Sequence, residues 1–183
     1  MDAVIGITGA SGSLYAIRLV EELVEHCRIT LVASETGKRM VAEETDYSFS
    51  DIEAMVHENV DNSDMGAAIC SGSRHFDAMV IVPCSMATLS KIACGISDNV
   101  ITRAAAVAMK ERRKLILVPR ETPLSSVHLE NMLRLSREGV IMLPAMPGFY
   151  GRPEEVGDLV DFIVGRIMDQ MGLDAQVGPR WGE

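Results

Sequence analysis

The sequence has no apolar run that approaches the roughly 20 residues needed to cross a bilayer. Its first residues enter a strand-like run without a signal-peptide pattern. Basic residues are also in deficit: 17 against 26 acidic residues give a net charge of −9, which repels nucleic acid and anionic membranes. We therefore expect a cytoplasmic protein with no membrane insertion and no nucleic-acid partner.

Paired cysteines and clustered metal ligands are missing as well. Cys27, Cys70, Cys84 and Cys94 include no C-x-x-C pair and lie in apolar or helical contexts, so we expect reduced thiols. The four histidines are scattered and no aspartate-rich pair occurs, which argues against a metal site. Only 4% of the residues are aromatic, whereas methionine reaches 12, and this adaptable filler of cores and interfaces favours an oligomer.

The apolar residues that are present fall in short runs separated by helical patterns. Strands buried on both faces by helices have such continuous apolar runs, which indicates a parallel sheet of β-α-β units. We expect one domain over residues 1–183, a doubly wound, Rossmann-like (flavodoxin-like) three-layer α/β sandwich with a mainly parallel sheet. The predicted strands are Ala3–Thr8, Arg28–Ala33, Ala78–Val82, Leu115–Val118 and Val140–Leu143.

Helical periodicity fills the intervening segments. The clearest amphipathic pattern is Pro153–Met171, with Pro153 suited to a first helical turn. We expect this helix and the tail after it, residues 153–183, to take part in subunit contacts. The segment Asp46–His75 is the least regular and is interpreted as a helix followed by a polar excursion. The other predicted helices are Ser13–His26, Ser85–Cys94, Asn99–Arg112 and Ser125–Arg137.

Ligands of such sheets lie beyond the carboxyl ends of the strands, so the residues after each strand are candidates for binding. The turn from Thr8 to Ser13 opens a helix and could bind a phosphate, although a tight turn with a serine cap is equally consistent. After the second strand, Ser34 begins another helix that ends near Glu44, a residue that would by itself be interpreted as solvated. After the third, Pro83–Thr88 carries hydroxyl groups at a helix start, which predicts a second anion site.

Five more candidate residues follow. Arg103 and Lys110 are seven positions apart and share a helix face, as a surface stripe or a phosphate clamp. Arg120 lies in a stiff loop between two prolines, where bidentate anion binding is favoured. Tyr150 offers a hydroxyl group from an apolar loop, and Arg166 borders the apolar stripe of the last helix.

Two other classes of enzyme, nicotinamide dehydrogenases and serine hydrolases, are not favoured because their sequence motifs are incomplete here. A nicotinamide dehydrogenase is suggested by the first turn and by Glu35, but the full G-x-G-x-x-G is absent and no tyrosine has a lysine four positions later. A serine hydrolase would need G-x-S-x-G, and Gly9–Ser13 lacks the closing glycine. A non-catalytic binding protein stays open, because these residues indicate anion pockets more plainly than a reaction.

The order and spacing of the segments add further information. They are Thr8–Gly12, Glu44–Asp46, Pro83–Ser85 with Thr88, Arg103, Lys110–Arg113, Val118–Pro123, His128–Asn131, Pro147–Tyr150 and Pro179–Trp181. Together they resemble the UbiX-type flavin prenyltransferases over nearly the whole chain. The resemblance implies that a dimethylallyl group from dimethylallyl monophosphate is joined to N5 and C6 of reduced FMN without a metal. The prenylated FMN would serve a UbiD-type decarboxylase, and the assembly would be a homododecamer built from trimers.

The resemblance also assigns roles to individual residues. Glu44 would transfer protons, Ser11 would support chemistry near N5, and Lys110 and Glu121 would act around the departing phosphate. The positions that match FMN-binding ones are Gly9, Ala10, Ser11, Ser34, Ser85, Met86, Ala87, Thr88 and Arg120. Those that match substrate-binding ones are Arg103, Lys110, Arg120, Tyr150 and Arg166, some of them supplied by neighbouring subunits.

Two alternatives share the flavin pocket. An FMN-dependent cysteine decarboxylase would use P-A-S-A-N-T after the third strand, whereas this chain has Pro83-Cys-Ser-Met-Ala-Thr88, and its His75 lies close to the strand. An FMN carrier subunit would bind flavin but tolerate replacement of Glu44 and Arg166.

Overall fold

The computed structural model describes residues 1–174 and 176–182. Its fold is built on one sheet of six parallel strands. The strand order is β3-β2-β1-β4-β5-β6, so it reverses between β1 and β4. The predicted doubly wound α/β fold is confirmed. The strands are β1 (Asp2–Ile7), β2 (Arg28–Ala33), β3 (Glu58–Asp61), β4 (Ala78–Cys84), β5 (Lys114–Pro119) and β6 (Ile141–Met142).

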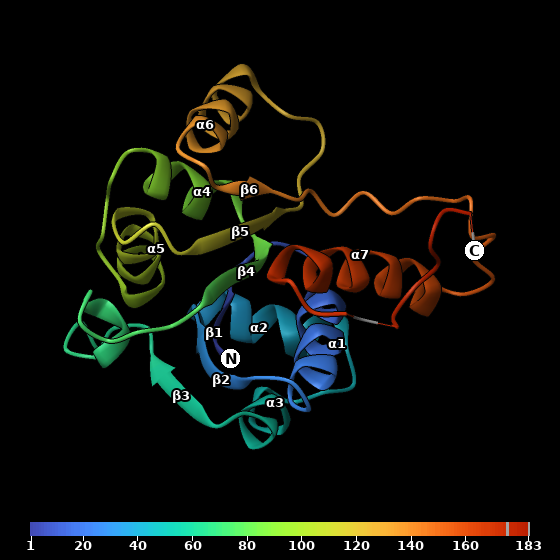
Figure 1. Cartoon of the computed structure of the whole chain (residues 1–183), viewed down its shortest axis with the longest axis horizontal. Helices are drawn as coiled ribbons and strands as arrows, with labels where there is room; N and C mark the ends of the chain where they lie inside the picture. Colours follow the sequence, from blue (N-terminus) through green and yellow to red (C-terminus); the bar gives the residue numbers. More distant parts are fainter. Residues whose placement is uncertain (175, 183) are drawn as a thin grey trace.

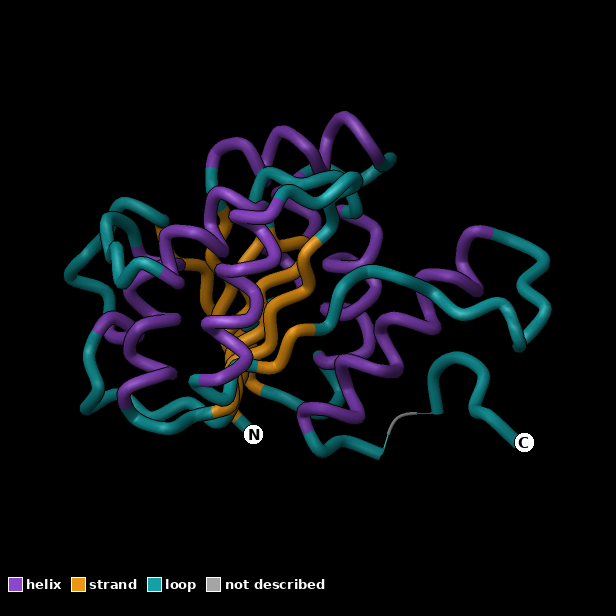
Figure 2. Tube along the Cα trace, turned by 90° about the horizontal axis from the view of Figure 1, so that it is seen from above, coloured by secondary structure: helices purple, strands orange, loops and turns teal. Residues whose placement is uncertain are grey.

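Helices cover both faces of this sheet, as the views of Figures 1 and 2 show. Each face has its own apolar core: one is closed mainly by α1, α2, α3 and α7, and the other by η1, α4, α5 and α6. The helices are α1 (Ser13–Leu23), α2 (Glu35–Glu44), α3 (Phe49–Met55), η1 (Ala68–Cys70), α4 (Met86–Ala93), α5 (Val100–Lys110), α6 (Ser126–Arg137) and α7 (Val156–Met171).

The strands alternate their side chains between these two cores. In β4, Val80 and Val82 face the core under α1 and α7, whereas Met79 and Ile81 face the core under α4 and α5. All four are fully buried, because both faces of a central strand are covered. This explains why the central strands have continuous apolar sequences.

Two predictions about the elements were wrong. The irregular segment contains the expected helix, α3, but also an edge strand, β3, which pairs with β2 alone. This strand was missed because three of its four residues are polar and only Val60 is buried. The last helix starts at Val156 with Glu155 as its N-cap, so Pro153 lies outside the helix.

A segment of the chain extends away from the sheet. We call it the arm, and define it as residues 144–155, the first turns of α7 and residues 176–182; Figures 1 and 2 show it on one side of the molecule. Its large apolar side chains are exposed: Trp181 is 82% exposed, Phe149 71% and Met146 65%. An apolar surface of this kind is typical of a contact with another chain.

The start of α2 presses against the end of β1, which gives a first prediction. A Cβ atom added to the buried Gly37 would lie 2.7 Å from the Ile7 carbonyl oxygen, which is too close for a normal contact. Because that oxygen belongs to the backbone of β1, either β1 or α2 would have to move. We expect Gly37→Ala to lower the free energy of unfolding by roughly 1–3 kcal/mol, as measured by urea denaturation.

The matched control is Gly157→Ala, the same change in the exposed first turn of α7, where the nearest atom would be 3.5 Å away. This variant should be neutral or more stable by up to about 1 kcal/mol, because alanine favours helix. Equal stabilities of the two variants would contradict the close contact at Gly37.

Candidate functional site

The loops after β1 and β4 meet where the strand order reverses, and Thr8 joins them. The Thr8 backbone N–H and hydroxyl group both donate to the Pro83 carbonyl, at 3.2 and 2.8 Å. The Thr8 Oγ1 atom in turn accepts from the Ser85 N–H at 2.7 Å. Thr8 is only 1% exposed, so its bonds form in a dry environment. Ligands bind at this position in open α/β sheets, and we call the region between the loops after β1 and β4 the crevice.

The start of α1 is partly occupied by a side chain from another helix. Glu44, at the end of α2, accepts hydrogen bonds from the Gly12 N–H at 2.9 Å and the Ser13 N–H at 2.8 Å, both on Oε2. No side chain of the turn itself caps α1. The serine cap expected for this turn is therefore wrong, because a carboxylate from a distant helix takes these two amide groups. Phosphate binding by the rest of the turn stays a prediction.

The surroundings of Glu44 favour its charged form. Partial burial by itself would raise the pKa of this carboxyl, but the Ser11 hydroxyl and the backbone N–H groups of Ser13 and Gly12 together stabilise the carboxylate more strongly and hold the pKa below its ordinary value. Glu44 is therefore not the solvated helix residue that its sequence position alone suggested. It lies within reach of Ser11, so the structure brings these two predicted catalytic residues together.

The helices α2 and α4 do offer free amide groups. Ser34 caps α2 by accepting from the Gly37 N–H at 3.0 Å, and Ser85 caps α4 by accepting from the Thr88 N–H at 3.2 Å. The first-turn N–H groups of Thr36 and Ala87 have no hydrogen-bond partner in the described part of the chain. An anion at these two helix starts would gain unpaired N–H donors and favourable helix dipoles.

The remaining predicted flavin-binding residues lie at the same edge. Gly9 packs against Thr36 at the start of α2, and Ala10 is buried beside it. Met86 is buried at the start of α4, where the Ser85 hydroxyl also bonds to the Thr88 hydroxyl at 3.0 Å. The structure thus brings together the loops that were predicted to bind FMN.

Arg120 closes this crevice from the end of β5. Its Nε atom donates to the Ser11 carbonyl at 3.0 Å, so its guanidinium group lies over the first loop. The neighbouring Glu121 is exposed and accepts from the Thr122 N–H at 3.1 Å. Tyr15, on the first turn of α1, lies close enough to feel the Arg120 charge. Tyr15 was not among the predicted site residues. The one sequence signal for it was its position one turn after the glycine-rich loop.

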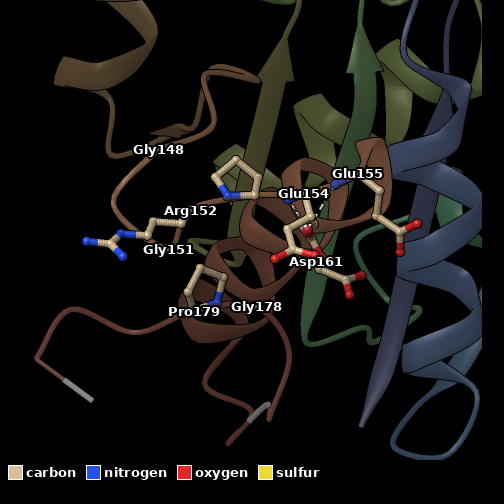
Figure 3. Close-up of a pocket in the computed structure, with 10 residues that line it drawn as sticks. Gly148, Gly151, Arg152, Glu154, Glu155, Asp161, Gly178 and Pro179 are labelled. Atoms are coloured by element: carbon tan, nitrogen blue, oxygen red, sulfur yellow. Dashed lines mark hydrogen bonds between the residues drawn. The ribbon is translucent and has the colours of Figure 1, made fainter.

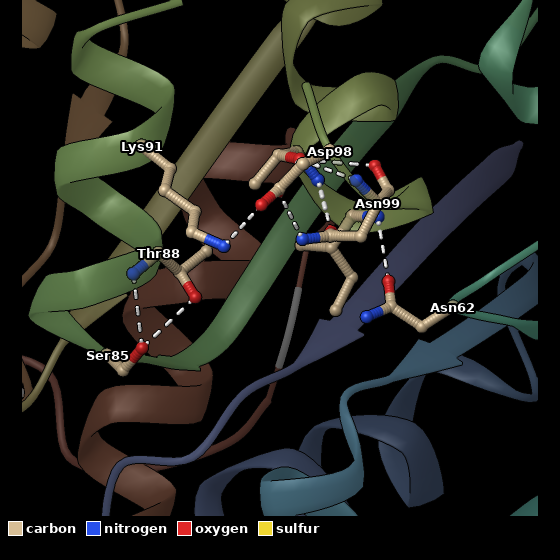
Figure 4. Close-up of polar contacts among 8 residues, drawn as sticks. Asn62, Ser85, Thr88, Lys91, Asp98 and Asn99 are labelled. Atoms are coloured by element: carbon tan, nitrogen blue, oxygen red, sulfur yellow. Dashed lines mark hydrogen bonds and ion pairs between the residues drawn. The ribbon is translucent and has the colours of Figure 1, made fainter. Parts of the chain in front are cut away.

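A second missed group is the polar network that fixes α4 and α5, drawn in Figure 4. The Lys91 ammonium of α4 lies 2.6 Å from the Asp98 carboxylate, and the Asn99 side chain accepts from the Thr102 N–H at 3.0 Å. Asn62 accepts from the Val100 and Ile101 N–H groups at 2.9 and 3.1 Å, through its carbonyl and its side chain. The start of α5 is thereby fully bonded within the chain, unlike the starts of α2 and α4.

Two predicted cationic residues lie elsewhere in this subunit. Arg103 donates to the Cys70 carbonyl at 3.1 Å, and so holds the segment around η1. Lys110 is exposed at the last residue of α5, where it pairs with Glu111. Because α5 runs opposite to the strands, Lys110 lies at the amino edge of the sheet, away from Arg120. Its predicted role would require a neighbouring subunit.

Tyr150 and Arg166 line a pocket of about 450 Å³ on the arm, together with Trp181. The Tyr150 ring meets the rings of Phe162 and Trp181 edge to face, with centroids 5.7 and 5.0 Å apart. Arg166 forms a 2.8 Å ion pair with Asp169 and stays half exposed. No contact in residues 1–174 and 176–182 joins this pocket to Ser11 or Arg120.

A larger cavity on the arm, about 820 Å³, is drawn in Figure 3. Four of its lining side chains are acidic, Glu154, Glu155, Asp158 and Asp161, and Arg152 is its one basic lining residue among those described. This surface would repel a phosphate. The crevice at the strand ends is better suited to an anionic ligand.

Two further findings concern metal ligands and membrane spans. Within the described ranges, no three histidine, cysteine or acidic side chains cluster in a way that could hold a metal ion. No helix among the described residues is long and apolar enough to span a bilayer. Cys84, at the end of β4, is fully buried, and this burial raises its thiol pKa to about 12, so it is a poor nucleophile.

The fold and the anion-suited crevice define a flavoprotein: a sequence model described as "Flavoprotein" matches residues 1–168. Among curated proteins, the flavin prenyltransferase UbiX of Thermoplasma acidophilum is 51% identical, covering 99% of this chain and all of that protein. The protein of the same name from Methanocaldococcus jannaschii is 46% identical, covering 100% and 99%. The chain belongs to the UbiX-type flavin prenyltransferase family within the flavoproteins.

Solved structures agree with this assignment. A dodecameric FMN-dependent UbiX-like decarboxylase from Escherichia coli O157:H7 is 45% identical, with a TM-score of 0.98 and full coverage of both chains. AnUbiX (PadA1), solved with FMN and dimethylallyl pyrophosphate, is 40% identical, with a TM-score of 0.97 over 100% of this chain and 97% of its own. The peptidyl-cysteine decarboxylase EpiD is 18% identical over 80% of this chain and 81% of its own, with a TM-score of 0.63, which shows a shared fold only.

The capping role of Glu44 gives a prediction for stability. Because its pKa is lowered on folding, the charged form stabilises the fold above about pH 4.5, and this contribution is lost as the pH falls through the folded pKa. We expect Glu44→Ala to cost about 0.5–2 kcal/mol of unfolding free energy at pH 7, as loss of a helix cap does. The cost should shrink between pH 5 and pH 3, as measured by urea denaturation along a pH series.

Glu43→Ala is the matched control, since Glu43 is exposed on the same helix and, among the described residues, its one ion pair is with Arg39, at 3.5 Å. It should change stability by less than about 0.5 kcal/mol. A cost for Glu44→Ala that equals this control, or that is the same at every pH, would contradict the capping role.

Proposed function

We propose that this protein transfers a dimethylallyl group from dimethylallyl monophosphate to reduced FMN, forming bonds at N5 and C6. The observation that carries the proposal is the crevice where β1 and β4 part, with two free helix starts and Arg120 beside it. Family membership and the relatives' names support the same reaction. An FMN-dependent cysteine decarboxylase is less favoured, because its similarity is confined to the fold.

The residues present fit a phosphate-bearing flavin. The unpaired N–H groups at the starts of α2 and α4 and the hydroxyl groups of Ser34, Ser85 and Thr88 suit phosphate oxygens. When bound, reduced FMN supplies the electron-rich N5 and C6 that become alkylated. Gly9, Ala10 and Ser11 would border the ring from the first loop, and Met86 and Ala87 from α4. Arg120 would lie over the ring and face the second substrate.

The chain's own groups can assist the departure of phosphate without a metal. The allylic C–O bond breaks, and its electron pair leaves with the phosphate, whose growing negative charge would be stabilised by the guanidinium groups of Arg120 and Arg166. Apolar walls from the arm would exclude water from the cationic carbon. The atoms of the overall reaction balance. The C5H9 group replaces one hydrogen of reduced FMN, a net gain of C5H8, and the released phosphate takes up the displaced proton.

Proton movement would involve Ser11 and Glu44. Glu44 is charged in this structure, so it can accept a proton, and the Ser11 hydroxyl links it to the crevice. The released phosphate is a second base within reach of the new bonds. Glu121 would help to orient this phosphate from beside Arg120, and Lys110 and Arg103 would add positive charge from other subunits.

The arm would complete the site in a neighbouring subunit. Within one chain Tyr150 and Arg166 make no contact with the crevice, whereas their exposed surroundings suit a contact between copies. We infer that residues 153–183 of the single domain form subunit contacts and that the assembly is a dodecamer, the state of the Escherichia coli O157:H7 relative. Ala175 and Glu183 of that segment lie outside the described residues.

The product suggests a place for the protein. Prenylated FMN is a cofactor rather than an end product, so a decarboxylase of the UbiD type would receive it. We place both proteins in the cytoplasm, in keeping with the acidic net charge of −9.

The direct test mixes purified protein with reduced FMN and dimethylallyl monophosphate, without oxygen or divalent metal, and weighs the extracted flavin by mass spectrometry. A flavin heavier by one C5H8 unit would support the proposal. Unmodified FMN with both the monophosphate and the diphosphate donor would overturn it.

Arg166 gives a sharper prediction. We expect Arg166→Ala to reduce prenyl transfer by at least about tenfold, since a guanidinium–phosphate bond stabilises by roughly 1.5–3 kcal/mol. FMN binding should stay within about twofold of the unaltered protein, because the groups proposed to hold FMN lie in the loops after β1 and β4 and at the starts of α2 and α4. Single-turnover transfer and flavin fluorescence titration measure the two effects.

Arg39→Ala is the control, an arginine of α2 that is exposed and pairs only with Glu43. It should transfer the prenyl group at the normal rate. If both variants are equally active, Arg166 does not hold the leaving phosphate.

The arm makes a separate prediction about assembly. We expect the double variant Phe149→Ala, Trp181→Ala to form smaller assemblies, because two of the most exposed aromatic side chains would be lost from the contact. Light scattering after size-exclusion chromatography measures the mass. The control Met65→Ala removes an exposed apolar side chain outside the arm and should leave the mass unchanged. An unchanged mass for the double variant would exclude the arm as the main contact.

A further inference from the structure

Tyr15 lies at the crevice but belongs to no set of predicted site residues. It is on the first turn of α1, half-buried, with its ring packed against the core beneath α1 and α7. A Cβ atom on Gly12 would come within 2.9 Å of the Tyr15 ring, and Gly12 has a φ of 118°, which favours glycine. The loop is therefore shaped to leave room for this ring. The same Cβ atom would lie 3.8 Å from Pro83 of β4, so the start of α1, which carries Tyr15, adjoins the junction of β1 and β4.

The Tyr15 hydroxyl group differs from those of the other two tyrosines. The Tyr47 hydroxyl donates to Glu21 at 2.8 Å, and the Tyr150 hydroxyl donates to the Pro179 carbonyl at 3.3 Å. The Tyr15 hydroxyl has no hydrogen-bond partner among the residues that the structure describes. A half-buried tyrosine hydroxyl normally has a partner, which here must come from water or a ligand.

The charge beside Tyr15 indicates what that ligand is. Burial raises the pKa of the phenol, an effect that the nearby Arg120 charge only partly offsets, so the hydroxyl stays protonated and can donate. Arg120 itself is anchored to the Ser11 carbonyl through Nε, which leaves its Nη groups for other acceptors. A guanidinium group and a phenol donor at the same edge of the sheet, near enough for the charge of one to act on the other, are suited to a phosphate group.

We propose that Tyr15 is a substrate-binding residue, which donates its hydroxyl hydrogen to the phosphate of the allylic substrate beside Arg120. The proposal rests on the proposed prenyl transfer and adds one donor to the phosphate site. It assigns the interaction to the allylic phosphate rather than to the FMN phosphate, because the free helix starts of α2 and α4 already suit the latter.

The test compares Tyr15→Phe with the unaltered protein, both loaded with FMN. Dimethylallyl monophosphate is titrated into the oxidised holoprotein by calorimetry, so that binding is measured without turnover, and inorganic phosphate is used as a competitor. We expect Tyr15→Phe to weaken binding of both by about tenfold or more, as loss of a hydrogen bond to a charged group does. The affinity for FMN should stay within about twofold.

Tyr47→Phe is the matched control, since it removes a tyrosine hydroxyl that is bonded on the surface of α1. It should bind the phosphate ester normally. Unchanged binding by Tyr15→Phe, or a loss of FMN affinity with normal binding of the ester, would overturn the proposal. A failure of the proposed function itself is distinct, because then the unaltered protein would neither bind the ester nor prenylate reduced FMN.

A second measurement is independent of whether Tyr15→Phe folds. In the protein labelled with 3-fluorotyrosine, Tyr47→Phe and Tyr150→Phe assign two of the three fluorine resonances, which leaves the third to Tyr15. Adding inorganic phosphate to the FMN-loaded protein should shift the Tyr15 resonance and leave that of Tyr47 in place. A Tyr15 resonance that does not move at saturating phosphate would contradict the proposal.

Discussion

The buried side chain of Thr8 is the constraint on which the crevice depends. Its hydroxyl group donates to the Pro83 carbonyl and accepts from the Ser85 N–H, so it holds the loops after β1 and β4 at a fixed separation. At this point the strand order reverses and the helices leave on opposite faces of the sheet. A ligand between the loops therefore meets preformed donors rather than mobile ones, which lowers the entropic cost of binding.

The four helix starts at this edge divide into two kinds. Those of α1 and α5 receive side chains from elsewhere in the chain: Glu44 takes two N–H groups at the first, and Asn62 and Asn99 bond the second. Those of α2 and α4 keep unpaired N–H groups. This division leaves free donors for an anion at one helix start on each face of the sheet, whereas the charged carboxylate of Glu44 is already bonded at the start of α1. An acidic protein can thereby bind anionic ligands locally.

The fold was largely predictable from the sequence, and the site only in part. Continuous apolar strands and periodic helices identified the doubly wound sheet, because burial on both faces imposes those patterns. The edge strand β3 escaped, since its polar residues carry no such signal. The candidate loops were found because they follow strands, but Tyr15, Asn62 and Asp98 could not be, because their roles depend on contacts with residues far along the chain.

The sequence by itself determined the fold class, the family and the set of loops that border the crevice, because local periodicity and ordered motifs are properties of the chain. Only the tertiary structure decided that Glu44 reaches the start of α1, that Lys110 lies at the opposite edge from Arg120, and that the arm separates Tyr150 from the crevice. The physical reason is that a side chain's partners are set by the packing of whole elements. Spacing along the sequence does not specify that packing.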